Sequence, residues 1–306
     1  MSGSDFTNEI STINRLRKEL DAIILAHNYQ LDEVQEIADI VGDSLALSQV
    51  AAKTPAKIII FCGVHFMAES AAILSPEKTV ILPDETAGCP MAEMAEATEV
   101  LKWRELYPDA AVVSYVNSTA AVKAVSDYCC TSANAVKLVR NIPEKELIFL
   151  PDQNLGHYVA TQVPKKKIHI WPGYCLTHHR VTPEDVWKAK QFHPDALVLI
   201  HPECRSEVIE LADYIGSTSQ IIEYAKKSPA SEFIIGTEMG ILHSLKKENP
   251  EKTFYVLSPG LVCPNMKLTT IPKVLSALQK LKPVITVAPE IREKAGKALD
   301  RMLQYI

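Results

Sequence analysis

The sequence lacks long apolar runs and any excess of basic residues. None of its segments approaches the 18 or more consecutive apolar residues of a membrane-spanning helix. The first residues, MSGSDFTNEI, lack the basic stretch and apolar run of a secretory signal. The formal net charge is -5, with acidic and basic residues interleaved, so there is no basic stripe for nucleic acid or anionic lipid. We therefore expect a cytoplasmic protein that binds small molecules, with no nucleic-acid or membrane partner.

Signature motifs of several enzyme classes are also missing. The chain has no G-x-G-x-x-G, G-x-x-x-x-G-K-[ST], H-E-x-x-H or G-x-S-x-G motif, so nucleotide-driven and serine-hydrolase chemistry lack their usual markers. It has no C-x-x-C either, although it contains seven cysteines. An odd number of cysteines in a reducing compartment argues against a disulfide framework. Free, catalytic or metal-binding thiols are expected instead.

The sequence does contain a series of short apolar runs, rich in β-branched residues, that alternate with helical patterns. Such runs are typical of buried strands in parallel sheets. Hydrophobic residues make up 47% of the chain, enough to build cores for two or three compact domains. Strands are predicted at residues 57–61, 110–116, 146–150, 167–171, 196–201, 232–236 and 253–257, and helices near 8–21, 271–281 and 290–303.

An internal repeat of about 87 residues runs through the chain. The strand ends AHNY (26–29), SYVN (114–117) and IHPE (200–203) are separated by 88 and then 86 residues. Each leads to an aspartate, which we expect within a helical segment, and five residues later to a hydroxyl, which we expect at a capped helix start. The aspartates are Asp39, Asp127 and Asp213, and the hydroxyls are those of Ser44, Ser132 and Thr218.

The repeat predicts an α/β fold of three similar αβα domains with parallel sheets, arranged with pseudo-threefold symmetry around a central site. The predicted domains are residues 1–88 with 264–306, residues 89–174, and residues 175–263.

Three cysteines follow the same repeat. Cys89, Cys175 and Cys263 are 86 and 88 residues apart, and each lies in a loop after a strand, where parallel α/β sheets bind ligands. Three thiolates with a vacant fourth position fit a catalytic zinc, or a 4Fe-4S cluster with one open iron. Because structural zinc favours closely spaced cysteine pairs, we favour the cluster. The other cysteines, Cys62, Cys129, Cys130 and Cys204, are expected to be small buried hydrophobes.

Each repeat also offers two polar side chains at a strand end. The pairs are His27 with Tyr29, Tyr115 with Asn117, and His201 with Glu203. One pair alone would be a hydrogen-bonded couple, but three pairs in register indicate a shared site. The helix starts near Ser44, Ser132 and Ser217/Thr218 suit small anionic ligands.

Two other features are left open by the sequence. Asp152 and Glu238 are 86 residues apart, and they either join the site or cap neighbouring helices. His178 follows Cys175 by three residues and is expected near the cluster, whereas His179 and Arg180 are expected to be surface or salt-bridge residues.

Several motifs together carry a family resemblance. In order along residues 26–267 they are AHNYQ, GDSLALS, FCGVHFMAES, AGCPMA, YVNSTAAVKA, CTSANAV, PDQNLG, WPGYCLTHHR, HPEC, GSTSQII, GTEMG and CPNMK. With them the chain resembles the quinolinate synthase (NadA) family. The resemblance implies a transferase that condenses iminoaspartate with dihydroxyacetone phosphate to quinolinate, with loss of phosphate and water, in NAD biosynthesis. It also implies one 4Fe-4S cluster.

The resemblance assigns site residues by their positions in these motifs. Cys89, Cys175 and Cys263 match the cluster ligands, and no further cysteine lies near Cys263, unlike in members with a C-x-x-C-x-x-C run. We hypothesise that Tyr29, His201 and Glu203 are catalytic, with Glu203 and Tyr29 moving protons. The implied substrate-binding residues are His27, Ser44, Tyr115, Asn117, Ser132, His178, Ser217 and Thr218.

Three alternatives stay open at this point. They are an iron-sulfur hydro-lyase acting on another hydroxy acid, a ligand-binding or iron-sensing protein without turnover, and a zinc protein. An aspartate oxidase that supplies the unstable iminoaspartate is a possible partner, and at least one domain is expected to move to admit substrate.

Overall fold

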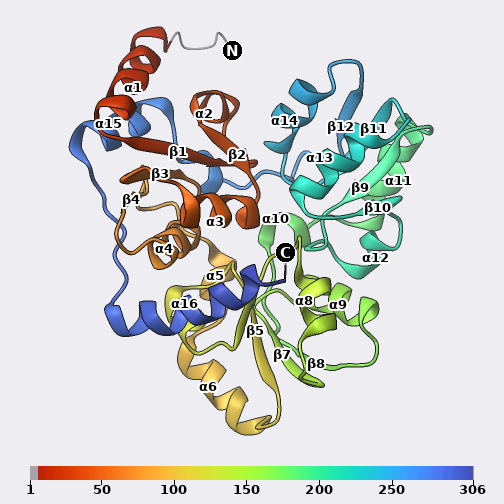
Figure 1. Ribbon diagram of the computed structural model, residues 1–306. Coiled ribbons are helices and arrows are strands. Elements are labelled where there is room, and N and C mark those ends of the chain that lie inside the picture. Colours follow the sequence, from red (N-terminus) through yellow and green to blue (C-terminus); the bar gives the residue numbers. More distant parts are fainter. Residues whose placement is uncertain (1–5, 306) are drawn as a thin grey trace. The chain divides into compact units, whose positions relative to one another are not determined.

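The computed structural model describes residues 6–305, and its core is three parallel four-stranded sheets (Figure 1). The sheets have the strand orders β2-β1-β3-β4, β6-β5-β7-β8 and β10-β9-β11-β12. Every sheet therefore uses the same order, second-first-third-fourth, as the threefold repeat requires. The predicted fold class, α/β with three similar αβα modules, is confirmed.

The elements of the first module are the strands β1 Ala22–His27, β2 Ile40–Gly42, β3 Ile58–Cys62 and β4 Thr79–Ile81, with the helices α1 Thr7–Glu19, α2 Asp32–Ile37, α3 Ser44–Lys53, α4 His65–Leu74 and α15 Ile271–Lys280. Those of the second are β5 Ala111–Tyr115, β6 Tyr128–Cys130, β7 Glu146–Leu150 and β8 Lys167–Ile170, with α5 Pro90–Glu93, α6 Ala97–Leu106, α7 Ala120–Ala124, α8 Ala135–Asn141, α9 Gln153–Gln162 and α16 Pro289–Leu303. Those of the third are β9 Leu197–Ile200, β10 Tyr214–Ile215, β11 Glu232–Gly236 and β12 Thr253–Val256, with α10 Leu176–His179, α11 Pro183–Phe192, α12 Ser206–Ile209, α13 Thr218–Lys227 and α14 Ile241–Glu248. A short 3-10 helix, η1, covers Asn265–Lys267.

The seven predicted strands are all present, and their ends agree with prediction to within one residue. The short strands β2, β4, β6 and β10 were not predicted, because two or three residues are too few to show a period. Among the described residues, no helix has the length and apolar character needed to cross a membrane.

The chain divides into two compact units. One comprises Met1–Cys89 with Pro264–Ala288, and the other comprises Pro90–Cys263 with Pro289–Ile306, of which residues 1–5 and 306 lie outside the described part. The first unit holds the first sheet, and the second unit holds the other two. The division of the second unit near residue 175 stays a prediction.

The last helix differs from expectation. We predicted that residues 264–306 belong wholly to the first domain, but α16 packs against α7 and β6 of the second unit. Its buried face includes Leu299 and Met302, and the Met302 carbonyl accepts a hydrogen bond from Asn134 Nδ2 at 3.3 Å. An amphipathic pattern shows that a helix has a buried face but not which sheet covers it.

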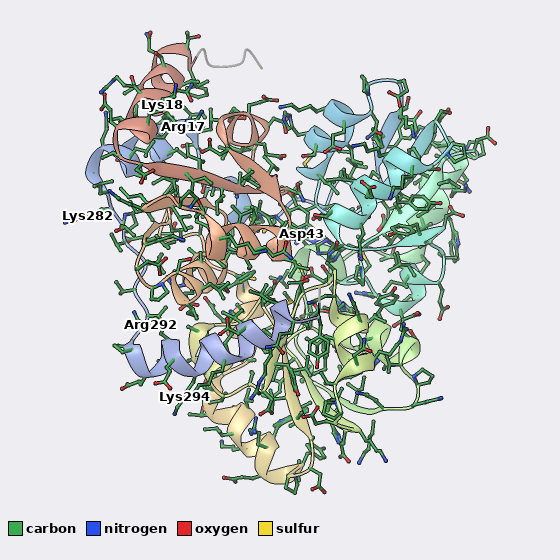
Figure 2. The ribbon with its side chains drawn as sticks, in the orientation of Figure 1. Arg17, Lys18, Asp43, Lys282, Arg292 and Lys294 are labelled. Atoms are coloured by element: carbon green, nitrogen blue, oxygen red, sulfur yellow. The ribbon has the colours of Figure 1, made fainter. Side chains whose placement is uncertain are left out.

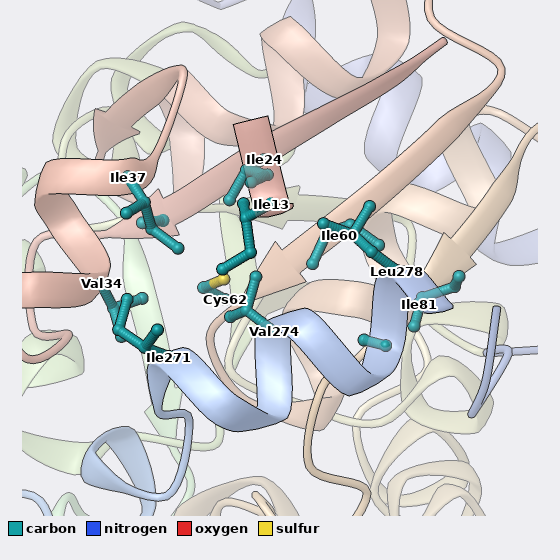
Figure 3. Close-up of a cluster of buried hydrophobic side chains, with 12 residues drawn as sticks. Ile13, Ile24, Val34, Ile37, Ile60, Cys62, Ile81, Ile271, Val274 and Leu278 are labelled. Carbon is teal, nitrogen blue, oxygen red and sulfur yellow. The ribbon is translucent and has the colours of Figure 1, made fainter. Parts of the chain in front are cut away.

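The core of the first unit lies between β1, β3 and the helices α1 and α15 (Figure 3). Ile13, Ile24, Ile60 and Val274 are completely buried there. Each such side chain contributes about 1.5–3 kcal/mol by leaving water. Cys62 is part of this apolar cluster.

The same aspartate-to-backbone hydrogen bond occurs at the amino end of each of the three sheets. We expected Asp39, Asp127 and Asp213 in helical segments, but each lies directly before the second strand of its sheet. There, each carboxylate accepts a hydrogen bond from the backbone N–H of a residue 15 positions earlier, near the start of the first strand. The donors are Ile24 at 2.8 Å, Val112 at 2.8 Å and Val198 at 2.7 Å.

Of the predicted helix starts, one is capped as expected, one is capped by the preceding residue, and one begins no helix. Ser217 caps α13 as expected, accepting from Gln220 N–H at 3.3 Å. Ser44 begins α3, but the cap is Asp43, whose carboxylate accepts from Ala46 N–H at 3.0 Å (Figure 2). Ser132 caps no helix, because α8 begins only at Ala135. A run of several polar residues does not reveal which one turns the chain into the helix.

Candidate active site

Glu203 is the centre of a buried polar cluster in the second unit, where the strands β5 and β9 end. Its side chain is 3% exposed. One carboxylate oxygen, Oε2, lies 2.8 Å from His178 Nδ1, and the other accepts from Asn117 Nδ2 at 3.4 Å. The Tyr115 hydroxyl donates a further hydrogen bond to the carboxylate. The cluster therefore surrounds one acid with three polar side chains.

The charges in this cluster follow from burial and from these contacts. Burial by itself would raise the pKa of Glu203, but His178, His201 and the Tyr115 hydroxyl together lower it to about 2. Burial lowers the pKa of His201 to about 3, so its imidazole is neutral near pH 7. Glu203 is thus an ionised carboxylate with proton donors around it.

His201 is oriented by two hydrogen bonds. Its Nδ1 accepts from the backbone N–H of Glu203 at 3.3 Å, so in the neutral ring the proton is on Nε2. That Nε2 lies 3.2 Å from Ser132 Oγ. The ring also stacks on His178, with centroids 4.9 Å apart. The neutral ring therefore offers an N–H donor on its Nε2 side.

His178 links this cluster to Cys175. Its Nδ1 lies 3.2 Å from Cys175 Sγ as well as near Glu203, and its Nε2 lies 2.9 Å from Thr237 Oγ1. The ligand atoms of Cys175, His178 and Glu203 are all within 4.8 Å of one another. Sulfur, nitrogen and oxygen donors this close together could hold a metal ion, and such a mixed set suits zinc.

The loops that carry Cys175 and Cys263 are attached to buried carboxylates. The Cys175 N–H donates to Asp152 Oδ2 at 3.1 Å, and the Cys263 N–H donates to Glu238 Oε1 at 3.2 Å. Asp152 and Glu238 are both completely buried. Burial and the nearby Glu203 raise the pKa of Asp152 well above its usual value, against the backbone N–H groups of Leu155 and Cys175, which lower it.

The loop after β1 in the first unit holds His27 and Tyr29, which are 4% and 9% exposed. His27 Nδ1 accepts from Tyr29 N–H at 3.2 Å, as His201 does from Glu203, and the two rings meet edge to face with centroids 4.6 Å apart. Lys267 Nζ donates to the Tyr29 carbonyl at 2.5 Å. Two side chains that the sequence predicted for the site are thus in direct contact.

Cys89 and Ser44 belong to the same unit. Cys89 is half-buried, and the carbonyl of the preceding residue, Gly88, accepts from Asn265 Nδ2 at 2.8 Å. Ser44 is half-buried at the first position of α3.

Comparison with known proteins now decides the family. The profile of the quinolinate synthetase A proteins (NadA) matches residues 11–304. The chain belongs to the quinolinate synthase family. It is 59% identical to the quinolinate synthase of Caldicellulosiruptor bescii over 292 residues, which are 95% of this chain and 96% of that one. It is 58% identical to that of Geobacter metallireducens over 291 residues, 95% of each chain, and 56% identical to that of Geotalea uraniireducens over 303 residues, 99% of this chain and 98% of that one.

In this member of the quinolinate synthase family, the second unit brings together many of the residues predicted for the site. The start of α13, with the buried residues Ser217 and Thr218, is tied to the loop of Ser132 because Gln220 Nε2 donates to the Ala133 carbonyl at 3.2 Å. The predicted site residues that lie in the second unit are Tyr115, Asn117, Ser132, Cys175, His178, His201, Glu203, Ser217, Thr218 and Cys263, and those in the first unit are His27, Tyr29, Ser44 and Cys89.

The four cysteines outside the repeat are buried, as predicted. Cys62, Cys129, Cys130 and Cys204 have no exposed surface. Burial raises the pKa of Cys129 to about 12 and raises the pKa of the other three as well. Such thiols stay protonated, whereas Cys89, Cys175 and Cys263 are half-buried in loops.

Sequence reasoning missed three residues beside these sites. Asn154 donates to the Glu203 carbonyl at 2.9 Å, Thr237 contacts His178, and Lys267 contacts the Tyr29 carbonyl. All three lie inside motifs of the quinolinate synthase resemblance, PDQNLG, GTEMG and CPNMK. Those motifs were the available signal. The repeat gave none, because asparagine, threonine and lysine do not recur at the equivalent positions of the other repeats.

Proposed function

We propose that this chain condenses iminoaspartate with dihydroxyacetone phosphate to form quinolinate. The atoms balance when one phosphate and two waters leave, and no electrons are gained or lost. The reaction therefore needs acid-base catalysis at several steps but no oxidant. The proposal is carried by one observation: a member of the quinolinate synthase family buries an ionised Glu203 among Tyr115, Asn117 and His178.

The proposed cofactor is one 4Fe-4S cluster held by Cys89, Cys175 and Cys263. The chain supports this choice because only these three cysteines share the repeat spacing, and they are half-buried in loops while the other four are fully buried. When bound, the cluster supplies an open iron that acts as a Lewis acid toward a substrate oxygen or nitrogen.

Glu203 is proposed as the main general acid and base. Its carboxylate can take a proton from the substrate and pass it to a departing hydroxyl. The Tyr115 hydroxyl and His178 are its proton-exchange partners within the second unit, and His178 Nε2 is held by Thr237. Tyr29 is retained as a catalytic candidate on the first unit, with its ring against His27.

Asn117 is proposed to bind a substrate N–H or hydroxyl. Its Nδ2 donates to Glu203, so its Oδ1 is the free end of the amide. That Oδ1 is buried and has no hydrogen-bond partner among the described residues. A buried acceptor without a partner costs about 1–3 kcal/mol, which a donor from a bound substrate would recover.

We propose that serine and threonine hydroxyls and a neutral imidazole bind the carboxylate and phosphate groups of the substrates. His201 presents an N–H on its Nε2 side, beside Ser132. Ser217 and Thr218 lie where α13 begins, and Ser44 lies where α3 begins, so backbone N–H groups are close to all three. We propose that these residues and His27 orient carboxylate and phosphate oxygens.

In the cell, this activity would place the chain in NAD biosynthesis in the cytoplasm. Iminoaspartate is unstable in water, so an aspartate oxidase that produces it nearby is the proposed partner.

The decisive experiment is anaerobic purification followed by a visible spectrum and by iron, sulfide and zinc analysis. We expect about four irons and four sulfides per chain. A colourless protein with one zinc would favour the Cys175, His178 and Glu203 group as a zinc site instead. Incubation with both substrates should then yield a product absorbing in the near ultraviolet. An aliphatic product would indicate a hydro-lyase, and ligand binding without turnover would indicate a sensor.

A further inference from the structure

Asp152 and Glu238 occupy equivalent positions in the second and third repeats, each directly after a strand end. The residue after each makes the same backbone bridge to a cysteine loop. Gln153 N–H donates to the Gly173 carbonyl at 2.7 Å, and Met239 N–H donates to the Leu261 carbonyl at 2.9 Å. Each accepting carbonyl lies two residues before a cysteine. The equivalence therefore covers both the carboxylates and the loops they face.

In both residues the two carboxylate oxygens have different partners. One oxygen accepts from a backbone N–H nearby in the chain: Asp152 Oδ1 from Leu155 N–H of α9 at 2.7 Å, and Glu238 Oε2 from Gly240 N–H, just before α14, at 2.8 Å. The second oxygen reaches across to the cysteine N–H, at 3.1 Å for Cys175 and 3.2 Å for Cys263. These local bonds, a helix cap in the case of Asp152, account for the first oxygen only.

A completely buried carboxyl is costly unless its oxygens are hydrogen-bonded. Both Asp152 and Glu238 have no exposed surface, and each accepts from a backbone N–H nearby in the chain and from the N–H of a cysteine. If the cysteine N–H moved away, a buried oxygen would lose that partner. The carboxyl therefore resists displacement of the cysteine loop.

The first repeat lacks this arrangement. His65 N–H makes the equivalent backbone bridge, to the Ala87 carbonyl at 2.8 Å, but the residue before it is Val64. The valine side chain has no atom that can accept a hydrogen bond. A carboxyl at this position is therefore not required by the backbone fold, since the bridge forms without it.

We propose that Asp152 and Glu238 are positioning residues for two cluster ligands. They hold the Cys175 and Cys263 loops in the ligating arrangement before iron arrives and slow the loss of iron afterwards. This inference rests on the proposed cluster and concerns only the chain's own second unit. Partners that orient metal ligands typically change metal affinity about 10- to 100-fold when removed.

The test replaces one oxygen by an amide nitrogen. Asparagine caps helices as well as aspartate does, so Asp152→Asn can keep the bond to Leu155 N–H while its NH₂ group opposes the Cys175 N–H. Glu238→Gln makes the same change in the third repeat. Full-length wild type and variants are reconstituted with iron and sulfide under anaerobic conditions. Iron and sulfide per chain are measured, and bleaching of the visible absorbance by a chelator is timed.

Both variants are expected to lose iron about 10- to 100-fold faster than wild type. Asp152→Glu, which keeps the carboxyl, should fall between wild type and Asp152→Asn. Circular dichroism of the iron-free proteins should show the wild-type fold. If Asp152→Asn did not fold, the chelation rate of Asp152→Glu and that of Glu238→Gln would decide the question.

The matched controls are Asp127→Asn and Asp213→Asn. Each removes a carboxylate that accepts a strand N–H in the same sheet as its test variant, but at the amino end. They should bleach at the wild-type rate. Chelation rates within twofold of wild type for both Asp152→Asn and Glu238→Gln would overturn the inference while leaving the proposed function intact. A wild-type chain that binds no iron or sulfide would overturn both.

Discussion

The two ends of the three sheets have diverged to very different extents. At the amino ends, Asp39, Asp127 and Asp213 make one and the same hydrogen bond, to a backbone N–H 15 residues earlier, at 2.7–2.8 Å. At the carboxyl ends, the equivalent positions hold different pairs: His27 with Tyr29, Tyr115 with Asn117, and His201 with Glu203. The repeat is thus kept at one end and varied at the other.

This difference indicates that the amino ends of the sheets serve folding and the carboxyl ends serve the chemistry. The first strand of each sheet begins in the same way, so the same carboxylate satisfies the same N–H in every module. The proposed reaction joins two unlike substrates and would need different groups in different modules, which agrees with carboxyl ends that are no longer equivalent. His27 and His201 show the intermediate case: each accepts the N–H two residues later, but the residues that supply this N–H are Tyr29 and Glu203.

The largest expected effect is loss of the proposed 4Fe-4S cluster. Cys89→Ala, Cys175→Ala and Cys263→Ala should each abolish stable cluster binding, because three ligands are the minimum that leaves a single open iron. Iron and sulfide analysis measures this. Cys62→Ala is the control, since Cys62 is buried in the apolar core of the first unit, and it should keep the full cluster. Normal iron content in all three loop variants would contradict the assignment.

Glu203→Gln tests the chemistry of the carboxyl ends directly. The amide keeps the shape of the side chain but cannot take up a proton, so kcat should fall about 100- to 10,000-fold with the cluster present. Anaerobic assays of quinolinate formation provide the measurement. Glu207→Gln is the control, because Glu207 is an exposed residue of α12. Near-normal turnover in a cluster-loaded Glu203→Gln enzyme would show that another group carries the protons.

Asp127→Asn tests whether the amino ends are purely structural. It removes a charge from a hydrogen bond to Val112 N–H and from a two-point contact with Arg104, at 2.8 and 3.2 Å. The free energy of unfolding should fall by about 1–3 kcal/mol. Denaturant unfolding measures the loss, and turnover at low temperature should be within twofold of wild type. A large loss of turnover in a folded, cluster-loaded variant would show that the amino ends contribute to catalysis as well as to folding.

The smallest expected effect concerns a feature that the carboxyl ends still share. In the first repeat Gln35 Nε2 donates to the Gln30 carbonyl at 3.0 Å, and in the second the fully buried Lys123 Nζ donates to the equivalent Ser118 carbonyl. Lys123→Gln keeps a donor and should cost about 1 kcal/mol or less, whereas Lys123→Met should cost about 1–3 kcal/mol. Thermal unfolding compares the two. Equal losses would indicate that the charge matters more than the hydrogen bond.

Much of this architecture could be predicted from the chain alone. The apolar runs predicted seven strands to within one residue, and the repeat predicted three similar modules. The prediction failed for Asp39, Asp127 and Asp213, which were placed in helices. The repeat spacing showed that each aspartate has an equivalent in the other modules. It did not show that the partner is a strand N–H 15 residues earlier in the chain.

The candidate site was predicted in part, because its residues recur at the strand ends. What the spacing could not supply were partners distant along the chain, such as Thr237 for His178 within the third module, or Asn154 of the second module for the Glu203 carbonyl. The question of whether Asp152 and Glu238 cap helices or join a site was also open. Asp152 caps α9 with one oxygen and accepts from the Cys175 N–H with the other, whereas Glu238 accepts from the N–H groups of Gly240, just before α14, and of Cys263.

The sequence by itself determined the strands, the threefold repeat and the family. It also distinguished Cys89, Cys175 and Cys263 from the four buried cysteines, because all of these are properties of spacing and polarity along the chain. Only the tertiary structure decided that α16 packs on the second unit, and that Glu203 sits among Tyr115, Asn117 and His178. The physical reason is that a helix face or a carboxylate requires a partner, and several parts of the chain offer one. Packing in three dimensions selects which of them it contacts.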